Sequence, residues 1–351
     1  MQKIIITGAT SMLGTAVIRE YLQRNKNATN VTDATDTVIY AVVRPNSEKL
    51  HRLPQDERIK IVECEAGDYK HLLKEKIHDT CDTFFHFAWD GTGANREKST
   101  LNQAFNVVHT LAALTVAKQL DCKKFIGAGS QAEYGRLDLP SINEDSPAKP
   151  AIAYGIAKYA AGQLALIEAK KLDIDCFWVR VFSVYGQYDK PTSMISNAVN
   201  KMLKREKTSF TPALQRWDYL NCDDAGKAFY AIAEKAKGQG VYCLGSGKPR
   251  QLKEFIKSIR DIINPQTDTT ELGIGDIPYR GNEVMNLCAD ISKIERDTGW
   301  KPSISFEDGI RQLVALTSRG GVASRIAQRI AYIATLRRRN LQKLAVSVCY
   351  A

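Results

Sequence analysis

The chain has 351 residues, of which 44% are apolar and 25% charged, a composition typical of a globular protein with a sizeable core and not of a disordered one. No run approaches the about 18 apolar residues of a membrane-spanning helix, and the apolar start "MQKIIITG" is too short for a signal peptide. The net charge of +10 does not indicate a nucleic-acid-binding fold, because eight of the ten excess charges follow Asp308, after which no acid occurs.

The cysteines indicate the compartment. None forms a Cys-x-x-Cys pair, and most stand in apolar runs such as "VYCLG". This usage predicts reduced thiols in the core of a cytoplasmic protein and no metal site. The eight cysteines stand at positions 64, 81, 122, 176, 222, 243, 288 and 349.

Apolar, strand-like runs alternate with helix-like segments over the first two thirds of the chain. Strands are predicted at 3–8, 37–44, 59–68, 82–91, 123–130 and 174–186, and helices at 12–24, at 102–120 and from Ala153 onward. Continuous apolar strands alternating with helices predict an α/β fold whose parallel sheet is covered on both faces. The polar stretch 25–37 predicts a long surface loop, and past Gly186 the alternation becomes irregular, as in a smaller lobe.

The first strand leads into a glycine-containing turn, "IIITGATSMLG". Gly8 permits a tight turn, and Gly14 allows the following helix to pack closely on the strand. The backbone amides at the start of that helix then face an anion such as the pyrophosphate of a dinucleotide. We therefore expect the cofactor to contact Gly8, Thr10, Ser11, Met12, Leu13 and Gly14.

The end of the second strand bears on the choice of cofactor. An NAD site usually offers a carboxylate to the ribose 2′-hydroxyl there, whereas this chain has Arg44, whose guanidinium suits a 2′-phosphate. NADP(H) is therefore favoured over NAD(H). Asp68, at the end of the third predicted strand, is a candidate acceptor for the adenine amino group or a loop cap.

Three further residues form an acid/base pattern. Tyr154 and Lys158 are four residues apart and share one face of a helix. We expect the ammonium group to stabilise the phenolate and to lower the pKa of Tyr154. Ser130, at the end of a strand, is placed to hydrogen-bond a carbonyl or alkoxide oxygen.

These motifs together resemble the extended short-chain dehydrogenase/reductase superfamily, in its nucleotide-sugar epimerase/dehydratase/reductase branch. The resemblance covers roughly residues 3–316 and keeps the family's order. It includes, in sequence order, "TGATSMLG", "GD" at 67–68, "FHFAW", Asn106, "SQAEYG", "YGIAK", "VRVFSVYG", "WDYLNCDDAGKAF" and "GWKPSISFEDGI".

The resemblance implies a Rossmann-type, doubly wound parallel sheet with a smaller C-terminal α/β lobe that binds a nucleotide sugar. It implies a nucleotide-binding domain over 1–178, rejoined by about 218–247, a substrate lobe over 179–217 and 248–317, and a basic tail over 318–351. It also implies a homodimer formed through the helices that follow the fourth and fifth strands.

The resemblance also assigns residues. Ser130, Tyr154 and Lys158 become the catalytic trio, and Tyr154 and Lys158 also contact the cofactor. Two departures are Ser11, in place of the family's middle glycine, and Trp217, in place of an arginine that binds the substrate diphosphate. The further cofactor contacts are Phe87, Ala88, Trp89, Asn106 and Val181, and the substrate contacts are Trp89, Gln131, Ser183, Arg216 and Arg280.

The residues after Ser130 bear on the reaction type. Dehydratases of this family carry an acid pair there, and this chain has Gln131 and Ala132, which cannot exchange protons near neutral pH. Glu133 is one position further on, and in an extended segment its side chain points to the opposite face from Ala132. Dehydration is therefore disfavoured.

Hydride transfer at a sugar carbonyl remains, with Tyr154 as proton donor. One reading is a ketoreductase that consumes NADPH, which Arg44 favours. The alternative is a 4-epimerase that retains its cofactor, and a third reading, from another class, is a non-catalytic cofactor-binding scaffold. The intact Ser130, Tyr154 and Lys158 argue against the scaffold.

The last segment, residues 318–345, has apolar residues at helical spacing with arginines between them. One interpretation is a solvated helix that packs on the body or on a second subunit. The other is an amphipathic helix that makes a peripheral contact with an anionic membrane.

Overall fold

The computed structural model of the protein describes residues 1–26, 37–69, 77–264, 272–281 and 283–318. The expected loop 25–37 and the basic tail 318–351 therefore lie almost wholly outside the described residues. In the described part of the chain, no helix is long and apolar enough to cross a membrane.

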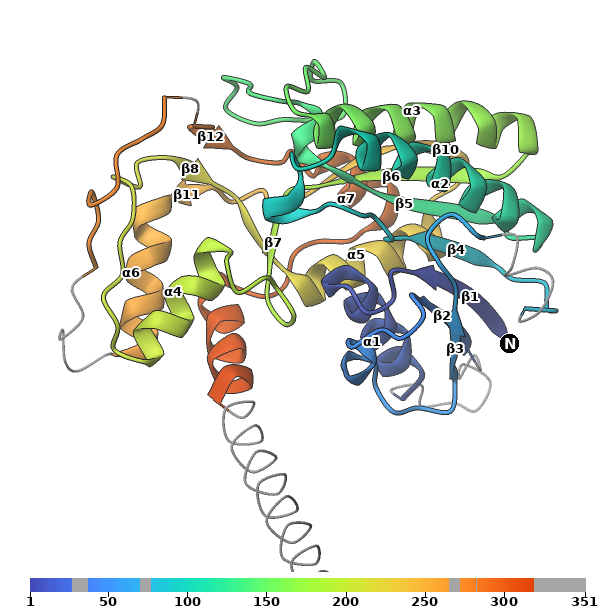
Figure 1. The fold of residues 1–351 in the computed structure, drawn as a ribbon, viewed down its shortest axis with the longest axis horizontal. Helices are drawn as coiled ribbons and strands as arrows, with labels where there is room; N and C mark the ends of the chain where they lie inside the picture. The colour runs from blue at the N-terminus through green and yellow to red at the C-terminus, as the bar shows by residue number, and fades with distance from the viewer. Residues whose placement is uncertain (27–36, 70–76, 265–271, 282, 319–351) are drawn as a thin grey trace, which may run out of the picture.

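A seven-stranded parallel sheet forms the centre of the larger part of the molecule (Figure 1). Its strand order is β10-β6-β5-β4-β1-β2-β3, so the order reverses beside β1, at the kind of switch point where doubly wound sheets bind ligands. The expected Rossmann-type α/β fold is confirmed. The strands are β1 (Gln2–Thr7), β2 (Thr37–Val43), β3 (Ile59–Glu63), β4 (Thr83–His86), β5 (Lys124–Ser130), β6 (Asp175–Val181) and β10 (Gln239–Leu244).

Helices cover both faces of this sheet because successive strand residues point to opposite sides. Ile4 and Ile6 of β1 pack in one buried cluster with α1 (Met12–Lys26) and α5 (Cys222–Lys235). Ile5 belongs to the other cluster, with α2 (Thr100–Gln119) and α3 (Ala153–Leu172). The central strands are thus apolar on both sides, as their continuous apolar sequence predicted.

A smaller lobe lies beyond the carboxyl ends of the strands (Figure 1). Its core packs α4 (Met194–Leu203) and α6 (Leu252–Ile263) against a helix over residues 306–318. The strand pair β7-β9 and the three-stranded sheet β11-β8-β12 complete it, as expected for a smaller C-terminal α/β part. These strands are β7 (Ser183–Tyr185), β8 (Arg216–Trp217), β9 (Tyr219–Asn221), β11 (Arg250–Gln251) and β12 (Asn286–Leu287), and α7 (Ser292–Thr298) packs beside β10.

Three predicted strands are shorter than expected. The third ends at Glu63 and the fourth at His86, before Gly67 and Gly91, whose positive φ angles of 112° and 70° do not fit a strand. The predicted strand 174–186 divides after β6, because β7 pairs with β9 of the lobe instead of continuing the main sheet.

The seven cysteines in the described residues are buried free thiols, in agreement with the expected core positions. Cys349 lies outside the described residues.

Candidate active site at the carboxyl edge of the sheet

A cleft of about 500 Å³ opens at the carboxyl ends of β1, β2 and β4. Seven of the residues predicted to contact a cofactor line it, namely Gly8, Thr10, Ser11, Arg44, Phe87, Ala88 and Trp89. The cleft is also lined by residues that the sequence did not suggest, including Ser47, Lys49, Tyr69, Thr92 and Lys190. Lys190 had no local signal, because it comes from the loop after β7, far along the chain.

The turn after β1 forms a backbone cradle on one wall of this cleft. Gly8 has φ +67°, and a Cβ there would lie 2.7 Å from the backbone nitrogen of Ala88. A Cβ on Gly14 would lie 2.5 Å from the Gly8 carbonyl oxygen, so the helix can approach the strand only without a side chain. Ser11 caps α1 by accepting a hydrogen bond from the Gly14 N–H at 3.0 Å. Within the described residues the Ser11 hydroxyl donates to no acceptor, so its proton and the first amides of α1 fit a pyrophosphate.

Eight predicted cofactor residues do not line this cleft: Met12, Leu13, Gly14, Asp68, Asn106, Tyr154, Lys158 and Val181. Asp68 is exposed beside it. Asn106 is buried, and its amide is engaged by the backbone of Asp90, accepting from its N–H and donating to its carbonyl, both at 2.9 Å. Asn106 therefore holds the loop after β4, which carries Trp89, instead of reaching the cleft itself.

The structure brings the predicted acid/base residues together. Ser130 ends β5, and α3 carries Lys158 and Tyr154, whose phenol is close enough to the Ser130 side chain to interact with it. The Lys158 ammonium is buried, donates to the carbonyl of Ala128 at 2.6 Å and lies 3.6 Å from the centre of a Trp89 ring. Trp89 is held in turn by a hydrogen bond from its indole N–H to Gln103 at 2.8 Å.

The electrostatics of Tyr154 differ from the expectation. Burial raises the pKa of Tyr154. The Ser130 side chain and the charge of Arg96 lower this pKa, but their effects are smaller than that of burial. Burial also lowers the pKa of Lys158 to about 7, against the opposing charge of Glu133. The expected lowering of the tyrosine pKa by lysine is therefore wrong for this structure, and at neutral pH Tyr154 carries the proton that a general acid needs.

Glu133 also departs from the extended geometry expected for it. Residues Gln131–Glu133 form a short 3-10 helix, η4, and the Glu133 carboxylate turns back to accept from the Ser130 N–H at 2.8 Å. It also accepts from the Trp178 indole at 2.9 Å and from Arg180 at 2.8 Å. This carboxylate is fully buried and engaged, so it fixes Ser130 and is not placed to exchange protons with a substrate.

The predicted substrate residues are distributed over both parts of the molecule. Gln131 stands on η4 beside Ser130, and Ser183 of β7 accepts a hydrogen bond from the Trp217 indole at 2.8 Å. Arg216 and Arg280 are exposed on the lobe. Trp217, which stands where the family has an arginine, is thus hydrogen-bonded to Ser183, one of the predicted substrate contacts.

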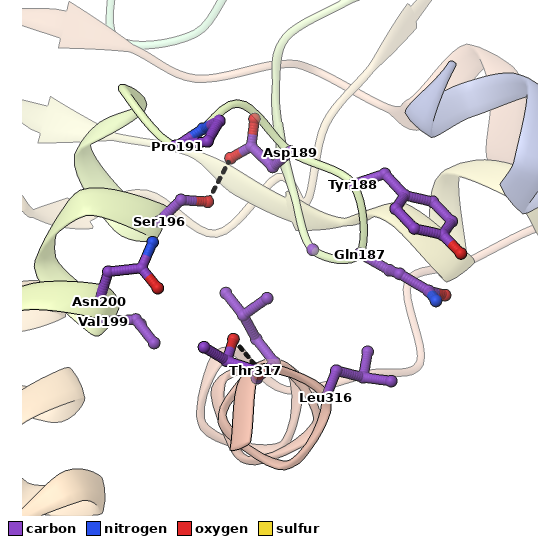
Figure 2. Close-up of a pocket in the computed structure, with 11 residues that line it drawn as sticks. Gln187, Tyr188, Asp189, Pro191, Ser196, Val199, Asn200, Leu316 and Thr317 are labelled. Carbon is purple, nitrogen blue, oxygen red and sulfur yellow. Dashed lines mark hydrogen bonds between the residues drawn. The ribbon is translucent and has the colours of Figure 1, made fainter. Parts of the chain in front are cut away.

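A second hollow, of about 260 Å³, lies between the loop 186–191, α4 and the helix over residues 306–318. Figure 2 shows Asp189 turned toward Ser196 on α4, and Thr317 bonded within its own helix. Asp189 also accepts from the Ser193 hydroxyl at 2.6 Å. These contacts fasten the loop to α4.

Comparison with known proteins agrees with this geometry. A profile of the NAD dependent epimerase/dehydratase family matches residues 4–245. The dTDP-4-dehydro-6-deoxyglucose reductase of Escherichia coli is 26% identical over 318 residues, which cover 89% of this chain and 96% of that protein.

Solved structures with the same fold include the UDP-glucose 4-epimerase of Thermotoga maritima with UDP-glucose, with a TM-score of 0.77, 20% identity and coverage of 91% of this chain and 99% of that one. The dTDP-glucose 4,6-dehydratase of Bacillus anthracis in complex with NAD has a TM-score of 0.74 and 19% identity, and the match covers 91% and 97% of the two chains.

Proposed function

Because the chain belongs to the NAD-dependent epimerase/dehydratase family of nucleotide-sugar enzymes, we propose that it is an NADPH-dependent 4-ketoreductase of a nucleotide-linked 4-keto-6-deoxy sugar. The enzyme class follows from the family. The reaction, the direction of transfer and the preference for NADP(H) over NAD(H) are the proposal.

The observation that carries the proposal is a protonated tyrosine beside Ser130, with no free acid following the serine. Tyr154 donates its phenolic proton to the carbonyl oxygen of the sugar, and the Ser130 hydroxyl stabilises the charge that develops on that oxygen. Lys158 lies on the same helix as Tyr154, against the Trp89 ring and the Ala128 carbonyl. A dinucleotide held in the cleft, whose lining includes Trp89 beside Tyr154 and Lys158, would supply the hydride for the carbonyl carbon.

The residues after Ser130 support reduction over dehydration. Gln131 and Ala132 offer no acid, and Glu133, the nearest carboxylate in sequence, is bonded to Ser130, Trp178 and Arg180. Removal of water from a sugar needs a group that protonates the leaving hydroxyl. None of these three positions provides one.

The cleft supports NADP(H). Arg44 lines it at the end of β2, where a 2′-phosphate is bound in this fold, and Ser47 and Lys49 follow on the same wall. We expect Arg44→Ala to weaken NADPH binding at least about tenfold and NADH binding less than threefold.

Turnover distinguishes reduction from the alternative, a 4-epimerase with retained cofactor. Purified protein is mixed with NADPH and a panel of 4-keto-6-deoxy sugars carrying dTDP, CDP, GDP or UDP, and absorbance of the reduced nicotinamide is followed. The reductase consumes NADPH in proportion to product over many turnovers. Tightly retained cofactor, with interconversion of 4-hydroxy sugar nucleotides and no net NADPH oxidation, would identify the epimerase instead.

A further inference from the structure

The loop 186–191 of the smaller lobe reaches the cofactor cleft with Lys190 and packs beside it with Tyr188. Lys190 lines the cleft, and its ammonium donates to the Thr92 hydroxyl at 2.9 Å. Tyr188 lies under the Arg52 guanidinium, 4.8 Å from the ring centre, and Arg52 in turn donates to the carbonyl of Thr10 at 3.4 Å. The lobe therefore contributes a side chain to the nucleotide-binding wall.

Three cations line this cleft without forming an ion pair in the described part of the chain. Arg44, Lys49 and Lys190 all line it, and within the described residues no carboxylate lies within 4.0 Å of any of the three charged groups. Asp189 beside Lys190 is engaged by the hydroxyls of Ser193 and Ser196. One carboxylate, Asp90, also lines the cleft, and it accepts from the Gly91 N–H and the Asn102 amide. Three cations against this one acid leave an excess of positive charge that suits an anion.

The same crowding acts on Lys190 itself. Burial, Arg96 and Lys49 lower the pKa of Lys190, and Asp189 raises it. An anion placed among these groups relieves their mutual repulsion, so Lys190 is held more favourably over a filled cleft than over an empty one, where it donates to Thr92.

We propose that Lys190 is a ligand of a phosphate group of the bound dinucleotide, contributed by the substrate lobe. This inference rests on one part of the proposed function, namely that NADP(H) or NAD(H) binds in this cleft. Asp189 fastens the loop to α4, and the loop begins just after β7, which carries Ser183. Binding of the cofactor phosphate by Lys190 therefore also fixes the lobe that receives the sugar (Figure 2 shows the loop and its contact with α4).

The test is the affinity of the full-length protein for NADPH in the absence of any sugar nucleotide. Lys190→Ala is compared with Lys190→Arg, which keeps the charge, and with Lys204→Ala, which removes an exposed lysine of the same lobe outside the cleft. Affinities are measured by calorimetric titration at two salt concentrations, and thermal unfolding confirms that each variant is folded. We expect Lys190→Ala to weaken NADPH binding about tenfold and to reduce its salt dependence.

The controls have defined outcomes. Lys190→Arg and Lys204→Ala should stay within about threefold of the wild type. An NADPH affinity of Lys190→Ala within twofold of the wild type overturns the assignment. If that variant binds NADPH normally and loses affinity for the sugar nucleotide alone, the anion is the substrate diphosphate and the assignment is again wrong. A wild-type protein that binds neither NADPH nor NADH contradicts the proposed function as well.

Discussion

Lys158 is the residue at which stability and activity oppose each other most clearly. Its ammonium is buried, is satisfied by the carbonyl of Ala128 and the face of Trp89, and has a pKa of about 7, far below that of a free lysine. Holding a proton there costs folding free energy at neutral pH, because the unfolded chain binds that proton more tightly. Such a cost is typical of a residue kept for chemistry.

We therefore predict that Lys158→Met raises the free energy of unfolding, on the order of 2 kcal/mol near pH 6, while removing most activity. Because the folded-state pKa is lowered, the wild type recovers stability as the pH rises from about 7 toward the pKa of unfolded lysine. The difference between the two proteins should shrink over that range. Urea unfolding at several pH values measures it, with Lys170→Met, on the exposed face of α3, as the matched control. A less stable Lys158→Met at pH 6 would contradict the prediction.

Tyr154 is the residue that the proposed reaction needs as its acid. Tyr154→Phe removes the donated proton and leaves the ring that lies edge-on to Trp89, so the turnover number should fall about 100-fold or more while NADPH affinity stays within threefold. Steady-state kinetics and cofactor titration check this. Tyr159→Phe, five positions further along α3 and facing Arg180, is the control and should keep full turnover. Equal losses in both variants would exclude a specific role for Tyr154.

At the scale of elements, the turn η4 depends on one buried ion pair. Glu133 and Arg180 are both almost fully buried, and the carboxylate ties the start of η4 to strand β6 while it accepts from the Ser130 N–H. Arg180 also lies over the Tyr134 ring, 4.5 Å from its centre. The position of Ser130 is therefore set by the pairing of two elements and not by its own strand alone.

Breaking this pair should be costly. Glu133→Gln leaves Arg180 buried beside a neutral amide, and we expect a loss of about 3 kcal/mol in the free energy of unfolding. Arg180→Met added to Glu133→Gln should restore part of that loss, because the uncompensated charge is then gone. Denaturant unfolding of the three proteins measures both steps, and a single variant within about 0.5 kcal/mol of the wild type would show that the pair does not hold the turn.

At the scale of the whole molecule, α2 and α3 leave an apolar surface uncovered. The two helices pack side by side on one face of the sheet (Figure 1). Their outward positions, at helical spacing, are Leu101, Phe105 and Val108 of α2 and Ile156, Leu164 and Ile167 of α3, all exposed. We propose that a second copy of the chain covers this surface. In a dimer with a two-fold axis, α2 and α3 of one subunit would pack against α2 and α3 of the other.

Charged substitutions on this surface should separate the subunits. Phe105→Glu combined with Ile167→Glu places carboxylates at the centre of the proposed contact, and we expect a monomer by light scattering where the wild type is a dimer. Leu214→Glu, at an exposed apolar position outside these helices, is the control and should leave the dimer intact. A wild type that is monomeric at micromolar concentration would contradict the proposed dimer.

Local patterns were sufficient to predict the parts of the site that belong to one element each. The glycines of the first turn had a short-range steric reason, and the four-residue spacing of Tyr154 and Lys158 fixed their common helix face. Ser130 followed from its place at a strand end, because parallel strands bring their carboxyl ends to one edge.

Features that depend on distant partners could not be predicted in the same way. The extended geometry expected for Glu133 was wrong because its partner Arg180 lies on another strand and draws the carboxylate back over a turn. Asn106 was expected at the cofactor and instead holds the backbone of Asp90. Lys190 lines the cleft because the smaller lobe packs beside the ends of β1, β2 and β4. No pattern in the sequence around Lys190 indicates this packing.

The transfer of a labelled hydrogen is the most direct test of reduction at the sugar carbonyl. The protein is incubated with a nucleotide-linked 4-keto-6-deoxy sugar and NADPH deuterated at each of the two C4 positions of the nicotinamide in turn, and the product is analysed by mass spectrometry and NMR. Stereospecific reduction predicts one deuterium bonded to C4 of the product sugar from one of the two labelled cofactors and none from the other, with Tyr154→Phe slowing its appearance. A 4-hydroxy product formed without deuterium from either cofactor, or no product from any nucleotide in the panel, would contradict the proposed reaction.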